Sequence, residues 1–240
     1  MIEREIDIHT PAGAMNTFVV CPDEAGPFPV VLFLMDAPGK REELHDMARR
    51  LATAGYFVML PNLYYRRVRE FVITPERRAE MVAHMNSLSN AMVCEDVLSL
   101  LEFLRGDPSA QYGPVGVVGY CMSGPFAFAA AAAFPEKVAA AASFHGVRLC
   151  TEAEDSPHLD ADRIQAELYF GCAEHDEWAP REMIDALERH LAAAGARYRV
   201  EWYPGTHHGF VFPNRGEIYR KAAAETHWSR LLALFQRNLH

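Results

Sequence analysis

The chain has 240 residues, of which 50% are hydrophobic, and its 23 lysine and arginine residues against 32 aspartate and glutamate residues give a formal net charge of −9. This charge argues against a nucleic-acid-binding protein or one held on anionic lipid, because both kinds of surface need an excess of basic residues. The length suits a single domain over residues 1–240, large enough to bury a core without disulfide or metal crosslinks.

The five cysteines are odd in number and contain no C-x-x-C pair, and the first residues lack the basic and apolar segments of a signal peptide. The longest apolar stretch, Phe126 to Phe134, is far shorter than the roughly 20 residues that a bilayer span needs. We therefore expect a cytoplasmic protein with reduced thiols and no membrane segment. The sequence carries no signal for an oligomeric state.

Predicted strands and helices alternate along the chain. Thr74 and Pro75 are expected to cap and begin one of the helices, and the polar segment 149–162 is expected to be a surface excursion. The alternation predicts an α/β fold with a mostly parallel central sheet and helices on both faces. Strands are expected at 2–9 and 16–20, as a hairpin, and at 29–35, 56–60, 113–119, 138–144, 167–171 and 198–203; helices are expected at 41–54, after 74, around 93–104, at 126–134 and around 228–235.

The most informative segment is Gly119-Tyr120-Cys121-Met122-Ser123-Gly124, which follows a predicted buried strand and precedes an alanine-rich helix. Such a turn pushes its central side chain out at the carboxyl edge of the sheet, and small neighbours let the backbones pass. The start of a helix also favours a thiolate. The pattern predicts that Cys121 is a nucleophile; the alternative is that it is a small buried apolar residue.

A nucleophile of this geometry needs an acid and then a histidine on loops after later strands. The predicted strand at 167–171 runs into an acidic loop that contains Asp176, and the strand at 198–203 runs into a turn that contains His208. Taken singly, the aspartate could be solvated and the histidine could be an ordinary turn residue. Their order after Cys121 favours a catalytic triad.

These segments resemble the dienelactone hydrolases, a cysteine-nucleophile branch of the α/β-hydrolase fold. Residues Gly119 to Gly124 are similar to the G-Y-C-x-G-G elbow of the family, Asp176 with Pro180 to its acid loop, and His208-Gly209-Phe210 to its histidine turn. The resemblance covers nearly the whole chain. It implies an α/β-hydrolase fold in which Cys121 is the nucleophile, His208 the base and Asp176 the residue that orients the imidazole. Ser123 stands where the family usually has glycine, and a residue this small is expected to preserve the turn.

Acyl transfer also needs N–H donors for the developing oxyanion. The elbow supplies the N–H of Met122, and the loop after an earlier strand supplies a second donor, for which Ala37 is the candidate. The resemblance also places Asp36 at an acidic position that interacts with the resting thiol, so Asp36 is expected to restrain Cys121. The alternative is that Asp36 stabilises a Pro-Gly turn.

Two residues are expected to shape substrate choice. Arg66 aligns with an arginine that binds the substrate carboxylate in the family, and Trp178 follows the predicted acid by two positions. The alternatives are a solvated arginine beside Arg67 and Arg69, and a core tryptophan. The second anion-binding arginine of the family corresponds to Phe212 here, so the resemblance does not extend to that contact.

Together these features predict a hydrolase that cleaves an ester or lactone of a small molecule through a cysteinyl acyl-enzyme, without a cofactor. No metal site is predicted, because the adjacent residues His207 and His208 point opposite ways in an extended segment and no third ligand has metal-like spacing. The alternatives are a thioesterase or acyltransferase with the same triad, and a ligand-binding protein of the same fold without turnover.

Overall fold

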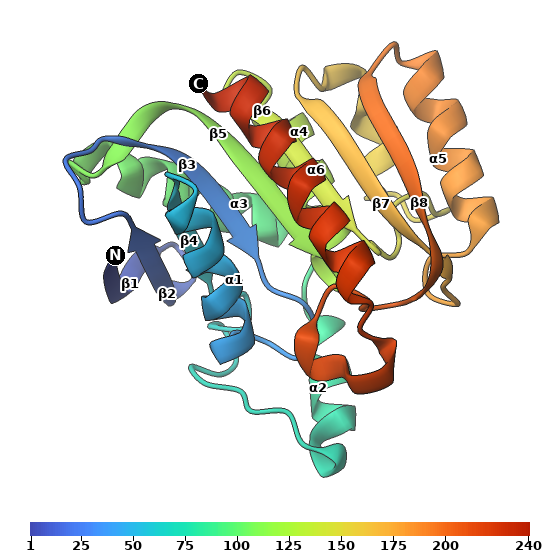
Figure 1. The fold of residues 1–240 in the computed structure, drawn as a ribbon, viewed down its shortest axis with the longest axis horizontal. Helices are drawn as coiled ribbons and strands as arrows, with labels where there is room; N and C mark the ends of the chain where they lie inside the picture. Colours follow the sequence, from blue (N-terminus) through green and yellow to red (C-terminus); the bar gives the residue numbers. More distant parts are fainter.

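A computed structural model describes all 240 residues as an eight-stranded sheet with helices on both faces (Figure 1). The strand order is β1-β2-β4-β3-β5-β6-β7-β8; only the β1–β2 and β2–β4 pairs are antiparallel. This confirms the predicted α/β-hydrolase fold class. The strands are β1 (Ile2–Thr10), β2 (Gly13–Cys21), β3 (Phe28–Leu34), β4 (Phe57–Pro61), β5 (Ala110–Tyr120), β6 (Val138–Phe144), β7 (Glu167–His175) and β8 (Arg197–His207).

The helices cover the sheet from both sides (Figure 1). Helices α1 and α6 lie on one face, and α3, α4 and α5 lie on the other. The α-helices are α1 (Glu42–Thr53), α2 (Arg78–Met85), α3 (Asn90–Phe103), α4 (Gly124–Ala133), α5 (Arg181–Ala193) and α6 (Lys221–Leu239); the short 3₁₀ helices are η1 (Pro75–Arg77), η2 (Leu104–Gly106), η3 (Cys121–Ser123), η4 (Pro157–Arg163) and η5 (Pro213–Ile218).

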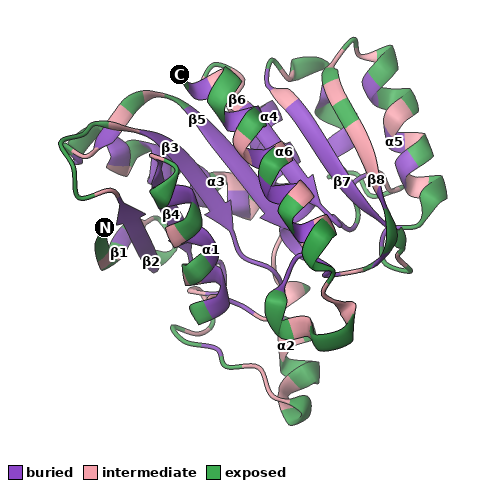
Figure 2. Ribbon diagram, in the orientation of Figure 1, coloured by how far each residue is buried: buried purple, intermediate pink, exposed green.

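Burial on both faces of the sheet explains why the sequences of the central strands are continuous apolar runs. Residues 29–34 of β3 and 115–120 of β5 are all buried, because helices cover both faces of these strands (Figure 2). Helix α6 approaches β5 closely at Gly116, where an added Cβ would lie 2.6 Å from the ring of Phe235. Helix α4 is buried almost completely because α3, η4, β5 and β6 surround it. The sheet therefore forms a rigid support for the loops at its carboxyl edge.

Two local expectations were met only in part: Thr74 and Pro75 do stand at the N-cap and first position of a helical turn, and part of the segment 149–162 is exposed. Pro75 begins a 3₁₀ turn that leads into α2, but the side chain of Thr74 makes no capping hydrogen bond. The segment 149–162 is not wholly a surface excursion, because Pro157 and His158 of η4 are buried against α4 and α5. Packing against two helices that lie elsewhere in the chain decides this burial, so the polarity of the segment did not predict it. No helix is long and apolar enough to cross a membrane.

Candidate active site

The turn after β5 has the strained geometry expected of a nucleophile elbow. Cys121 follows the strand directly and has a φ of 54°, a left-handed conformation that is uncommon for any residue other than glycine. A Cβ at Gly119 would overlap the Ser123 carbonyl, and a Cβ at Gly124 would lie 2.6 Å from the Cα of Gly146. These two glycines are therefore needed for the backbones to pass.

Ser123, where the family usually has glycine, stabilises the elbow. Its buried hydroxyl accepts a hydrogen bond from the N–H of Tyr120 at 2.8 Å. The same hydroxyl lies 3.0 Å from the carbonyl oxygens of Tyr120 and of Leu34 in β3, and it donates to one of them. The serine thus satisfies a buried N–H that glycine would leave to another partner.

Contacts of the Tyr120 side chain hold the elbow in place. Its buried ring stacks on Phe33 and Phe144, and its hydroxyl lies 2.9 Å from Nε2 of His227. His227 Nδ1 lies 3.1 Å from the carbonyl of Ala224, so Nδ1 carries the proton and Nε2 accepts from the tyrosine. Burial lowers the pKa of His227 to about 3, so the histidine stays neutral and keeps this contact at physiological pH.

The predicted acid and base are hydrogen-bonded to each other. Nδ1 of His208 lies 2.8 Å from Oδ2 of Asp176, whose side chain is 1% exposed. The other oxygen, Oδ1, accepts from the N–H groups of Trp178 at 2.9 Å and Ala179 at 3.2 Å. With both oxygens held, the carboxylate orients the imidazole so that Nε2 is free for another partner.

The electrostatic environment favours a strongly basic His208. Burial alone would lower its pKa, but the hydrogen bond that Nδ1–H donates to Asp176 and the neighbouring sulfur of Cys121 outweigh this effect and raise the pKa to about 9. A raised pKa lets His208 hold a proton that it would take from the Cys121 thiol.

A second histidine packs against His208, and the sequence analysis missed it. His145 follows β6 directly, is buried and has a φ of 38°. Its ring meets that of His208 edge to face with 4.8 Å between centroids, and neither ring nitrogen has a hydrogen-bond partner. Burial, helped by His208, lowers its pKa well below the ordinary value, so His145 is neutral. Its place at the carboxyl end of a central strand was the signal that could have identified it.

The elbow and the histidine loop open into one cavity of about 850 Å³, hereafter the Cys121 cavity. This volume is in the usual range of roughly 300–1,000 Å³ for small-molecule sites. Four predicted residues line it, namely Cys121, His208, Ala37 and Trp178; the others are Pro38, Arg41, Glu43, Ile73, Thr74, Pro75, Arg78, Met81, Val82, Met85, Val147, Arg148, Asn214 and Arg215.

The two predicted oxyanion donors lie on loops that Tyr64 joins. The buried Tyr64 hydroxyl lies 2.8 Å from the carbonyl of Ala37 and 3.2 Å from the sulfur of Met122. The N–H of Ala37 donates to no protein acceptor, so it is free to bind an oxyanion. Tyr64 therefore holds the loop after β3 against the elbow.

The structure does not bring Arg66 to the Cys121 cavity. Its guanidinium instead makes two hydrogen bonds of 2.8 Å to the fully buried carboxylate of Asp96 in α3. An unpaired buried carboxylate would be strongly destabilising, so the arginine is needed there. The arginines that do line the cavity are Arg41, Arg78, Arg148 and Arg215.

Asp36 also has a different partner from the expected one. Its carboxylate is completely buried and pairs with Arg41, with the guanidinium of Arg215 3.7 Å away. No hydrogen bond joins it to Cys121. The carboxylate therefore serves first to neutralise the arginines beside the cavity.

We expect the Asp36→Ala substitution to lower the free energy of unfolding by about 3 kcal/mol, near the lower end for a broken buried ion pair, because Arg41 keeps a second contact with Glu43. Urea denaturation measures this loss. The exposed ion pair between Asp46 and Arg49 provides the control, since Asp46→Ala should change stability by less than about 1 kcal/mol. A faster reaction of native Cys121 with iodoacetamide in Asp36→Ala would instead support the thiol-restraining role.

Comparison with known proteins agrees with this geometry. A family model described as "Dienelactone hydrolase family" matches residues 15–239. A protein named "Putative carboxymethylenebutenolidase" from Synechocystis sp. is 26% identical over 223 residues, which covers 91% of this chain and 89% of the relative. A protein of the same name from Methylorubrum extorquens is 29% identical over 243 residues, covering 98% and 81%. A crystal structure named as that of a "Putative Dienelactone Hydrolase" from Klebsiella pneumoniae superposes with a TM-score of 0.87 at 26% identity and covers 98% of both chains.

Proposed function

The chain belongs to the dienelactone hydrolase family and is an ester or lactone hydrolase, and we propose that it acts through a Cys121–His208–Asp176 triad and a cysteinyl acyl-enzyme. One observation carries the proposal. Cys121, strained at the elbow, opens into the same cavity as His208, whose Nδ1 is 2.8 Å from the buried carboxylate of Asp176. A thiol, an imidazole and a buried carboxylate gathered in this way support the proposed roles of nucleophile, base and orienting acid.

In the first half of the reaction, Nε2 of His208 takes the proton of the Cys121 thiol, and Asp176 stabilises the imidazolium through Nδ1. The thiolate attacks the substrate carbonyl carbon, forming a C–S bond and a negative oxygen. The N–H groups of Ala37 and Met122 bind this oxyanion. When the tetrahedral intermediate collapses, the C–O bond breaks and His208 gives its proton to the departing alkoxide. In a lactone that oxygen stays attached to the acyl group.

In the second half, a water molecule attacks the thioester carbonyl while His208 takes one of its protons. The C–S bond breaks, the proton returns to the sulfur of Cys121, and the carboxylic acid leaves. The enzyme is thereby restored with its thiol protonated, and the reaction consumes one water for each bond cleaved.

Charge around the cavity supports an anionic small-molecule substrate. Asp36 and Glu43 balance Arg41 and Arg215, whereas Arg78 and Arg148 form no ion pair and are exposed at the cavity. A guanidinium with no carboxylate partner binds substrate carboxylates through charge-assisted hydrogen bonds. Trp178, 63% exposed, adds an apolar surface to the lining.

Covalent trapping tests the proposed mechanism. Rapid mixing with an activated chromogenic ester is expected to give a burst of the released alcohol, and mass spectrometry should find the acyl group on the peptide that contains Cys121. An acyl group found on another residue would contradict the mechanism. Turnover at the parental rate in the Cys121→Ala variant would contradict it as well. If an added thiol or alcohol takes the acyl group faster than water does, the enzyme is an acyltransferase with the same triad.

We expect the Arg148→Gln substitution to raise KM for esters that carry a carboxylate by about tenfold, since a hydrogen bond to a charged group contributes about 1.5–3 kcal/mol. KM for neutral esters and kcat for both should change little, because Arg148 does not contact the reacting atoms. Steady-state kinetics on matched pairs of substrates measures the difference. Arg105→Gln, which removes an exposed arginine outside the cavity, is the control. Equal increases in KM for both substrate types would show that Arg148 has only a structural role.

A further inference from the structure

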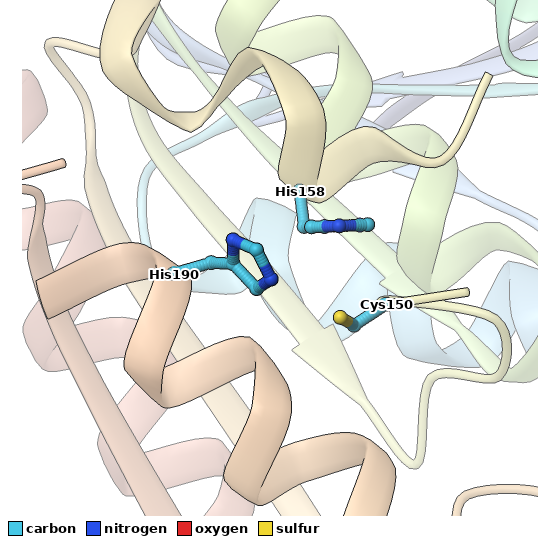
Figure 3. A group of neighbouring side chains, drawn as sticks. All are labelled: Cys150, His158 and His190. Carbon is cyan, nitrogen blue, oxygen red and sulfur yellow. The ribbon is translucent and has the colours of Figure 1, made fainter. Parts of the chain in front are cut away.

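Three side chains from separate segments meet outside the active site (Figure 3). Cys150 lies in the loop after β6, His158 in η4 and His190 in the last turn of α5. One ligand atom from each residue lies within 4.8 Å of the other two. The two imidazole rings are tilted by 61° to each other with 4.4 Å between centroids. No sequence motif joins these positions, which is why the sequence analysis expected no metal.

We propose that the Cys150–His158–His190 cluster is a Zn²⁺ site. A thiolate and two imidazoles are ligands that zinc prefers, and three protein ligands leave a fourth tetrahedral position for water. Zinc–ligand bonds of about 2.0–2.3 Å place tetrahedral ligand atoms about 3.3–3.6 Å apart. From separations of up to 4.8 Å, the ligand atoms therefore need to approach one another by at most about 1.2–1.5 Å. Rotation of the exposed His190 side chain supplies such a movement.

A hydrogen bond already orients the most buried ligand. Nδ1 of His158 lies 2.8 Å from the hydroxyl oxygen of Ser156, which also accepts from the N–H of Thr151 at 3.0 Å. With the metal on Nε2, the ring proton is on Nδ1 and is donated to the serine oxygen. Metal-binding histidines usually have such a second partner, because it selects the tautomer and holds the ring. Figure 3 shows this ring beside the imidazole of His190 and the sulfur of Cys150.

Metal binding by Cys150 and His158 is coupled to the protonation of these side chains. Burial and the nearby His190 lower the pKa of His158, against the opposing effect of Glu152. Burial raises the pKa of the Cys150 thiol; Arg189 opposes this effect and Glu152 adds to it. Zinc binding therefore forms a Zn–S bond and releases the thiol proton to solvent.

The position of the cluster suggests a structural role. The loop after β6 that carries Cys150 also contributes Val147 and Arg148 to the Cys121 cavity, and the Val147 N–H donates to the Cys121 carbonyl at 3.1 Å. A metal that joins this loop to η4 and α5 would stabilise one wall of the cavity. The triad chemistry proposed above does not pass through the metal, so zinc binding and ester hydrolysis can be tested separately.

The test uses the full chain, freed of metal with a chelator and titrated with Zn²⁺ against a chromogenic zinc indicator. We expect one equivalent to bind per chain. Cys150→Ser and His190→Gln should each weaken binding at least about 100-fold, and Ser156→Ala about tenfold, as for removal of an orienting partner. Cys94→Ser and His9→Gln, which alter a thiol and an imidazole outside the cluster, should leave the Kd unchanged.

Cobalt binding identifies the metal ligands by an independent, spectroscopic measurement. Co²⁺ bound to the parent chain should show a thiolate-to-metal charge-transfer absorption that disappears in Cys150→Ser and persists in Cys121→Ala. No zinc binding, or binding lost in Cys121→Ala and retained in Cys150→Ser, would overturn the proposal. His190 is exposed on α5, so His190→Gln is expected to fold and decides the question even if Cys150→Ser does not fold.

Discussion

Replacing Cys121 by alanine is expected to lower kcat/KM by a factor on the order of 10⁵–10⁶, comparable to the loss in a serine protease that loses its triad nucleophile. Without the sulfur, no acyl-enzyme forms and His208 has no thiol proton to accept. Cys121→Ser should also lose most of the activity, because a hydroxyl is a weaker nucleophile than an activated thiol. Steady-state kinetics with a chromogenic ester measures both losses, and thermal unfolding of the variants checks that the fold is retained.

Selective alkylation is the matching chemical test. Burial raises the pKa of the other four thiols, so near neutral pH they react slowly with iodoacetamide. Modification of a single residue, Cys121, should therefore track the loss of activity. Cys94→Ala is the control and should keep parental activity, since the Cys94 thiol lies outside the cavity. Full activity in Cys121→Ala would refute its assignment as the nucleophile.

The Asp176→Asn substitution is expected to lower kcat by about 10⁴-fold, as in other nucleophile–histidine–aspartate enzymes. The asparagine amide can donate to Nδ1 of His208, which puts the ring proton on Nε2 and leaves no base facing Cys121. Steady-state kinetics measures the loss. Glu177→Gln, at an exposed acid next to Asp176, is the control and should keep activity within a few-fold. Unchanged activity in Asp176→Asn would remove Asp176 from the mechanism.

The same variant tests the raised pKa of His208. A pKa raised from 6.5 to about 9 in the folded protein stabilises it fully below pH 6.5, and this stabilisation is lost as the pH rises through 9. Without the carboxylate, the pKa of His208 falls and this pH dependence weakens, since only the sulfur of Cys121 still raises the pKa. The difference in unfolding free energy between the parent and Asp176→Asn should therefore be largest near pH 6.5 and shrink toward pH 9. A difference that is constant over this range would contradict the charge interaction between Asp176 and His208.

The elements and the elbow were predictable because their causes are local. The apolar run before Gly119 makes a buried strand, and small residues on both sides of Cys121 permit the tight turn that follows. Parallel strands also bring their carboxyl ends to one edge of the sheet, so the order of Cys121, Asp176 and His208 predicted that their loops lie together. The hydrogen bond of 2.8 Å between Asp176 and His208 agrees with this prediction.

The partners of charged and polar side chains were decided only by the tertiary structure. Arg66 meets a buried carboxylate from α3, while Arg148, which no motif marked, lines the cavity. Asp36 pairs with Arg41, and the Cys150–His158–His190 cluster draws on three segments distant in sequence. The sequence by itself determined the fold and the order of the loops that carry the proposed triad, because strand, turn and helix preferences act over a few residues. It did not determine these contacts, because a long side chain can reach many partners and burial in the folded chain selects among them.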